Sequence, residues 1–309
     1  MSQFLTVDYL ISFLFSVIRM STPIIFCALG ALIANHAGAI NMALEGIMLT
    51  ASLIAVMFSA WLQSCWAGLL GAVIGGLLMS LLFAWLHLYK NSDLIITGLA
   101  LNTMASGGTV YLLYLVCGDK GTSRLLPSVN LPSVELPLIK DIPVLGPVLS
   151  GHNILTYLAL VAVLLCWLLV FRSRMGLRIR AVGFNPNAAS SVGISVRRIK
   201  FDAFLLSGLF ASLGGAFMSM GYLSYFARDM MAGRGYSGIA AATLADGRCL
   251  ASLLASLGFG TANAASITLA TMNLKADLVA MIPYLATVIG LVIVSARKQA
   301  KARKLQAAG

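Results

Sequence analysis

Charged residues are scarce in this sequence. Asp, Glu, Lys and Arg make up only 10% of its 309 residues, whereas 60% are hydrophobic. A soluble domain carries about a quarter charged residues, so the composition excludes an ordinary soluble fold. We expect an all-α polytopic membrane protein whose apolar surface contacts the lipid bilayer and neighbouring helices.

The sequence also lacks the motifs of common catalytic and metal sites. It contains no G-x-x-x-x-G-K-[ST] loop to cradle a phosphate, no G-x-S-x-G, no H-E-x-x-H and no C-x-x-C. Its three histidines, His36, His87 and His152, lie far apart, and its five cysteines are scattered. These absences predict a protein that is not an enzyme and that binds no metal or cofactor.

Acidic residues are outnumbered, with ten Asp and Glu against 21 Lys and Arg and a net charge of +11. Seven cations lie between Arg172 and Lys200, a stretch without any acid, and five lie between Arg297 and Lys304. Loops rich in Lys and Arg stay cytoplasmic, whereas a nucleic-acid-binding protein displays its cations among stacking aromatics. We therefore expect an inner-membrane protein with a cytoplasmic loop at 173–200, a cytoplasmic tail at 297–309 and no nucleic-acid partner.

Long apolar segments fill most of the remaining chain. A helix that crosses a membrane needs roughly 20 such residues. Two segments are short, one opening with Pro23 and the other interrupted by Gly233, Gly235 and Gly238, which is typical of broken helices in transporters. The ten segments lie at about 8–20, 22–35, 39–60, 65–89, 93–117, 152–172, 201–226, 233–246, 249–272 and 279–296.

The loop at 118–150 is the best candidate for an exterior segment, because it combines five prolines with mixed charges. Alternating the ten segments from this loop puts both the N terminus and the C terminus in the cytoplasm. Two sets of five segments then have opposite orientations, which predicts an inverted 5+5 repeat with the substrate path at its interface. We interpret residues 1–309 as a single transmembrane domain.

Three polar residues inside apolar runs are candidates for a polar pathway. Asn41 and Glu45 would share one face of a helix, and a carboxylate at the membrane centre costs at least about 2.5 kcal/mol unless it faces a cavity or a partner. Glu45 could instead lie near the inner interface, pair with a cation and only fix packing. Asn102 lies deep in the segment that follows Asp93, where it could bond a neighbouring helix, the reading we prefer, or a polar substrate.

A short helix is predicted inside the basic loop. Asn185 is a good N-cap, Pro186 suits the first helical position, and Gly193 would end the helix. So short a helix is not stable alone. It must dock on something, either another protein or, in the simpler alternative, the rest of its own chain.

Four motifs occur in an order that suggests a family. They are AGAINMALEGIML at 37–49, DLIITGLALN at 93–102, the long run GLRIRAVGFNPNAASSVGISVRRIKFDAFLLSGLFASLGGAF at 176–217, and AGRGYSGIAAA at 232–242. From about 20 to 295, the chain resembles the permease subunits of bacterial ABC importers of the branched-chain amino acid, ribose and nucleoside type.

This resemblance implies partners and a substrate class. The partners are a cytoplasmic ATPase subunit, a second permease subunit that is homologous or identical, and an extracytoplasmic substrate-binding protein. The form N-M-A-L-E-G at 41–46 is similar to the nucleoside-type permeases. The expected function is half of a translocation pathway for a nucleoside, lined by Asn41, Glu45 and Asn102. The alternatives are a simple sugar or a branched-chain amino acid, or a secondary transporter or channel acting alone.

The resemblance also implies that the short helix docks on the ATPase as a coupling helix, with the neighbouring arginines anchoring the loop on the ATPase or on lipid headgroups. One departure from the family occurs at 245–250, which lacks the Trp and Pro that relatives carry, so we expect a turn of different shape. The residues assigned to ATPase coupling are Arg178, Arg180, Asn185, Pro186, Ala188, Ala189 and Gly193.

Overall fold

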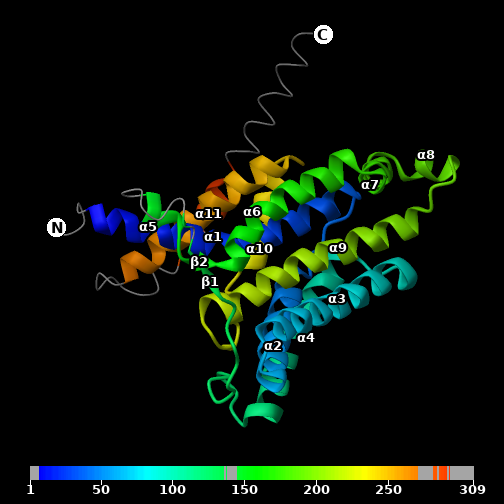
Figure 1. Cartoon of the computed structure of the whole chain (residues 1–309). Coiled ribbons are helices and arrows are strands. Elements are labelled where there is room, and N and C mark those ends of the chain that lie inside the picture. Colours follow the sequence, from blue (N-terminus) through cyan, green and yellow to red (C-terminus); the bar gives the residue numbers. More distant parts are fainter. Residues whose placement is uncertain are drawn as a thin grey trace.

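The computed structural model is a bundle of helices with one very short two-stranded sheet (Figure 1). It describes residues 7–135, 137, 145–270, 281–283, 285–290 and 292. Seven helices in this part of the chain are long and apolar enough to cross a membrane, which confirms the all-α polytopic class. Eight of the 18 residues of the predicted segment at 279–296, and all of the tail at 297–309, lie outside the described residues.

The helices and strands follow one another with short connections. Two π-helical turns, η2 and η3, extend α6 and α9 without a break. The strands pair antiparallel, with Ser133 opposite Asn153. The elements are α1 Val7–His36, α2 Leu44–Leu62, α3 Cys65–Lys90, α4 Leu94–Cys117, β1 Ser133–Val134, α5 Leu145–Leu149, β2 His152–Asn153, α6 Ile154–Trp167, η2 Leu168–Arg172, α7 Arg174–Phe184, α8 Pro186–Ser191, α9 Val196–Phe217, η3 Met218–Tyr222, α10 Arg234–Leu244 and α11 Cys249–Ala270.

The predicted break at Pro23 is wrong, because the segments at 8–20 and 22–35 form the single helix α1. Pro23 removes one backbone hydrogen bond, the one to the carbonyl of Arg19, and a membrane helix tolerates that loss where neighbouring helices enclose it, as they do for α1. The turn before the proline stays helical, with Ser21 Oγ donating to the carbonyl of Val17 at 2.7 Å and Thr22 Oγ1 to that of Ile18 at 3.0 Å. The merger removes one crossing from the predicted count, and with it the basis for placing the N terminus on the same side as the 173–200 loop.

Three helices form the centre of the bundle. Most residues of α1, α2 and α9 are buried, whereas only a small share of α4 and α11 is buried. The centre is held by large buried side chains from several helices, among them Phe26, Phe83, Phe204 and Phe217. The outer helices present Leu, Ile, Trp and Tyr outward, as a lipid-facing layer would.

Small residues let α3 approach α9 closely. A Cβ atom added at Gly208 would collide with Ser80, and one at Gly76 would collide with Ser212. Ser80 Oγ donates to the carbonyl of Phe204 at 2.6 Å, which is an interhelical hydrogen bond. Packing of small residues with an added polar contact is the usual way that membrane helices associate.

The two ends of the bundle differ. At one end the loop after α4 is tied to the segment between η3 and α10: the Ser123 amide donates to the Phe226 carbonyl at 2.9 Å, and the Phe226 amide donates to Ser123 Oγ at 2.8 Å. At the other end α7 and α8 project from the bundle, far from the start of α1 (Figure 1). The described part of the predicted exterior loop and the basic loop therefore lie at opposite ends.

Candidate functional site

Glu45 lies in the first turn of α2 and caps a different helix. Its Oε1 accepts a hydrogen bond from the Gly233 amide at 2.8 Å, and its Oε2 accepts one from the Gly235 amide at 2.6 Å. These amides belong to the start of α10, whose own N-cap, Gly233, offers no side chain. A carboxylate is favoured there because the unpaired amides and the helix dipole are both positive. Glu45 therefore joins α10 to α2.

Asn102 joins α4 to the same place. Its Oδ1 accepts from the Gly46 amide at 2.8 Å, and its Nδ2 donates to the Met42 carbonyl and the Tyr236 hydroxyl, each at 2.9 Å. The prediction of an interhelical hydrogen bond at Asn102 is thereby confirmed. The Asn102 side chain stays partly exposed. Through these bonds Glu45 from α2 and Asn102 from α4 converge on the first turn of α10.

The Asn41 side chain bonds other partners than these two residues. The helix α2 begins only at Leu44, so Asn41 lies in the turn before it. The side-chain oxygen Oδ1 of Asn41 accepts a hydrogen bond from the Ala43 amide at 3.1 Å. Such side-chain-to-backbone bonds compete with helix formation. Asn41 is fully buried and donates to Ser207 Oγ on α9 at 3.0 Å. The expectation that Asn41 and Glu45 share a helix face is therefore wrong.

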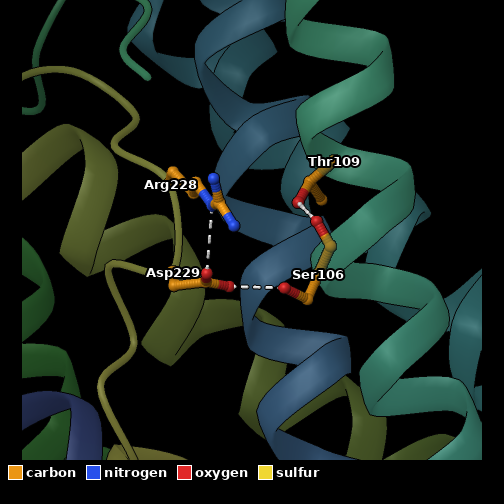
Figure 2. A network of polar contacts seen from close by, with 4 residues as sticks. All are labelled: Ser106, Thr109, Arg228 and Asp229. Carbon is orange, nitrogen blue, oxygen red and sulfur yellow. Dashed lines mark hydrogen bonds and ion pairs between the residues drawn. The ribbon is translucent and has the colours of Figure 1, made fainter. Parts of the chain in front are cut away.

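A polar stripe continues from Asn102 along the surface of α4. Ser106, one helical turn further on, donates to Asp229 Oδ1 at 2.6 Å, and Arg228 Nε is 3.4 Å from Asp229 Oδ2 (Figure 2). Tyr236, whose hydroxyl is bonded by Asn102, lies in the first turn of α10 and is 41% exposed. We call Asn102, Ser106, Asp229 and Tyr236 the polar stripe.

Sequence reasoning missed most of this stripe. Ser106 could have been found from its spacing of four residues after Asn102, since these positions share a helix face. Tyr236 lies within the AGRGYSG motif but was given no role, and Asp229 lies in an irregular segment that no periodic pattern marks. Only the fold brings them to α4.

The short helix α8 forms as predicted. Asn185 is its N-cap and accepts from the amides of Asn187 and Ala188 at 3.1 Å, Pro186 is the first helical residue, and Gly193 follows with φ of +81°. Ala189 is the one buried residue in α8. Ala188 is exposed, so of the two alanines assigned to coupling only Ala188 is open to a partner.

The surroundings of α8 are unusually apolar for a basic loop. Phe184 is 96% exposed and Val192 is 75% exposed, one on each side of the helix. Of the two arginines assigned to coupling, Arg178 is exposed, whereas Arg180 packs its guanidinium 5.2 Å from the Phe171 ring. Arg178 can therefore reach a partner, and Arg180 is engaged within its own chain.

The atypical turn at 245–250 packs against the end of α1. Asp246 and Gly247 both have positive φ, and the Gly247 carbonyl is 3.0 Å from His36 Nε2. His36 thus makes a structural contact with this turn. Within the described residues no three His, Cys, Asp or Glu side chains gather closely enough to hold a metal ion.

Comparison with known proteins places this arrangement in a family. Residues 13–296 match the family described as branched-chain amino acid transport system / permease component. The chain is 30% identical to the guanosine ABC transporter permease protein NupQ of Bacillus subtilis, with 88% of each chain covered. It is 30% identical to the nucleoside ABC transporter permease protein NupC of Lactococcus lactis, covering 88% of this chain and 89% of that one.

A more distant relative is a putative glucose ABC transporter permease protein, TsgC13, of Haloferax volcanii. The identity is 26%, over 84% of this chain and 78% of the relative. No solved structure matches the chain.

Proposed function

The chain belongs to the branched-chain amino acid transport system permease family, whose members are permease components of ABC transporters, and on that premise we propose that it carries nucleosides. Two relatives that match most of its length are named as guanosine and nucleoside permeases. A simple sugar is the second candidate, because a relative named as a putative glucose permease also matches. A branched-chain amino acid remains the third.

The observation that carries this proposal is the polar stripe. The half-buried Asn102 and Ser106 on the spanning helix α4 lie beside the exposed Asp229 and Tyr236. Polar groups at membrane depth are costly unless they face a cavity or a partner. Tyr236 offers an aromatic face on which a base can stack. Asp229 offers a carboxylate to a base edge or to ribose hydroxyls, and Asn102 Oδ1, which accepts one bond from Gly46, keeps a second acceptor position. The stripe lies on one side of a single chain, so a second permease subunit, identical or homologous, would enclose it.

The ATPase partner would bind at α8. The apolar residues Phe184 and Val192 flank the exposed Ala188, and buried aromatic anchors of this kind dominate many protein interfaces. We call Phe184, Ala188 and Val192, together with the exposed Arg178, the docking surface. This surface would bind a cytoplasmic ATPase that hydrolyses ATP. An extracytoplasmic binding protein would deliver the solute at the opposite end.

A movement of α8 has a direct route to the polar stripe. α9 begins five residues after α8 and runs with η3 through the centre of the bundle to Tyr222. The segment that follows carries Asp229 and leads into α10, which Glu45 holds. Alternating access would proceed by a shift of α9 that moves Asp229 and α10 relative to α4.

The orientation follows from the charges. The basic loop places α7 and α8 in the cytoplasm, and the C-terminal tail at 297–309 is proposed to lie there too. The start of α1 at Val7 is then on the external side, because α1 crosses once. An inverted repeat of the two halves remains part of the proposal.

Reconstitution tests the function. Proteoliposomes that contain this chain with its ATPase and second permease should take up radiolabelled guanosine only when ATP and the binding protein are supplied. Uptake by the chain alone would instead indicate a secondary transporter or channel. Competition by unlabelled glucose or leucine, with none by nucleosides, would favour the other substrate classes.

A pair of tyrosines tests the pathway. Tyr236→Ala should lower guanosine uptake about tenfold or more through lost stacking, with the protein yield unchanged. Tyr111→Ala is the matched control: Tyr111 is 63% exposed but lies nine residues after Asn102, on the opposite face of α4. Equal losses in both variants would refute the stripe as the pathway.

The docking surface has its own test. Ala188→Arg should abolish co-purification of the ATPase, because it puts a long cation into the centre of the docking surface. Leu125→Arg, at another exposed site on the loop at the other end, is the control. Retained ATPase in the Ala188 variant would exclude α8 as the coupling contact.

A further inference from the structure

Arg19 is a cation without an acidic partner in the described part of the chain. It lies about 18 Å along α1 from Val7. Its Nη2 donates to the Tyr222 carbonyl at 2.7 Å, and its guanidinium lies 4.5 Å from the Tyr222 ring. Neither contact neutralises the charge. An ionisable residue in a membrane helix marks a functional site whose partner must be identified.

The partner is not supplied by the cavity that Arg19 faces. This cavity of about 300 Å³ lies between α1, α6, η3 and the short sheet. No carboxylate lines it, and its polar residues besides Arg19 are Asn130, Ser133, His152, Asn153, Thr156 and Ser224.

The other polar groups of the lining do not carry charge or are already bonded. His152 is buried and stacks on Phe15 at a centroid distance of 4.0 Å. Burial lowers the pKa of His152 below its ordinary value, and the nearby charge of Arg19 lowers it further, so its imidazole is neutral at pH 7. Asn153 donates to the Leu131 carbonyl and accepts from the Leu155 amide. Arg19 is thus the one cationic side chain that lines the cavity. The lining offers hydrogen-bond donors but no anionic group.

We propose that this cavity binds one phosphate-type oxyanion, held by Arg19. A guanidinium has five N–H donors in a planar fork, of which the structure commits one to Tyr222. The remaining donors suit the paired oxygens of a phosphate group. The volume is at the lower end of small-ligand sites. The group is either free phosphate or the headgroup of an anionic phospholipid.

An occupied site would fix the external end of the bundle. Arg19 belongs to α1 and its contact, Tyr222, closes η3. Ser224, which also lines the cavity, opens the segment that carries Asp229 to the polar stripe. The oxyanion would therefore hold α1 against the part of the chain that is proposed to move.

Binding can be measured on the full chain in nanodiscs. In the first arm the bilayer is phosphatidylcholine alone, and inorganic phosphate is titrated by calorimetry. In the second arm the bilayer contains phosphatidylglycerol, and native mass spectrometry counts the lipids that stay bound. Saturation by one phosphate in the first arm assigns the free ion, whereas one retained phosphatidylglycerol in the second assigns the lipid headgroup.

The variants make the test specific. Arg19→Gln should weaken binding about tenfold or more, and Arg19→Lys should weaken it less because it keeps the charge without the fork. Ser133→Asp should weaken it similarly to Arg19→Gln by supplying a carboxylate from an exposed position of the lining, and it carries the test if Arg19→Gln does not fold.

Arg124→Gln is the matched control. Its guanidinium also lies 4.5 Å from a tyrosine ring, that of Tyr225, but Arg124 is exposed and does not line the cavity. Binding in this variant should be unchanged. The absence of saturable binding in both arms, or an equal loss in the Arg124 and Arg19 variants, would overturn the proposal.

Discussion

Two short helices, α8 and α10, are started in opposite ways. α8 is capped by Asn185, the residue directly before it, and one of its side chains is buried. α10 follows a glycine N-cap, Gly233, that has no side chain to offer, and it is capped by Glu45, 188 residues away in the chain. A helix capped by the adjacent residue needs no distant side chain at its start, so it can be presented to another protein. A helix capped by a distant residue forms only when the bundle is assembled, so the position of α10 depends on the packing of the bundle.

The largest effect is expected from removing the distant cap. Glu45→Ala leaves two amides at the start of α10 without acceptors, and hydrogen bonds to charged groups contribute about 1.5–3 kcal/mol each, so the loss should be about 3 kcal/mol or more. Thermal unfolding followed by size-exclusion chromatography of the detergent-solubilised protein measures it.

Glu45→Gln is the companion variant, because its amide keeps one acceptor oxygen. It should fall between the wild type and Glu45→Ala in stability. Loss of transport at wild-type stability in both variants would contradict the capping role and assign Glu45 to the solute instead.

A smaller effect is expected from separating α10 and α2. A Cβ atom at Gly235 would lie 2.7 Å from both the backbone nitrogen and the Cα of Glu45. Gly235→Ala should therefore cost about 1–3 kcal/mol, which is the usual penalty for overpacking. Gly258→Ala in α11 is the control, since an added Cβ there meets nothing within 4 Å, and its unfolding temperature should not fall. Equal destabilisation of the two variants would show that α10 does not depend on close approach to Glu45.

The contrast between the two helices explains what sequence could predict. Asn185, Pro186 and Gly193 lie within nine residues, and each acts on the backbone beside it, so α8 was predictable. Glu45 was marked as unusual by the cost of a carboxylate in an apolar run, but its partner could not be identified, because Gly233 reaches it only through the fold. The helix α1 was missed for a related reason: Pro23 suggests a break, and nothing local shows that the helix continues through it.

The smallest effect on stability is expected at the local cap, and its effect on coupling should be larger. Replacing an Asn N-cap by Ala costs about 1 kcal/mol of helix stability, and α8 contributes little to the bundle, since Ala189 is its one buried residue. Asn185→Ala should therefore leave the unfolding temperature nearly unchanged while lowering transport-linked ATP hydrolysis in proteoliposomes.

Asn185→Asp restores an acceptor for the amides of Asn187 and Ala188 and should restore this hydrolysis, because Asp is as good an N-cap as Asn. If instead Asn185→Ala destabilises the whole protein as much as Glu45→Ala does, α8 is part of the bundle and the distinction between a helix offered to a partner and a helix held by its own chain does not hold.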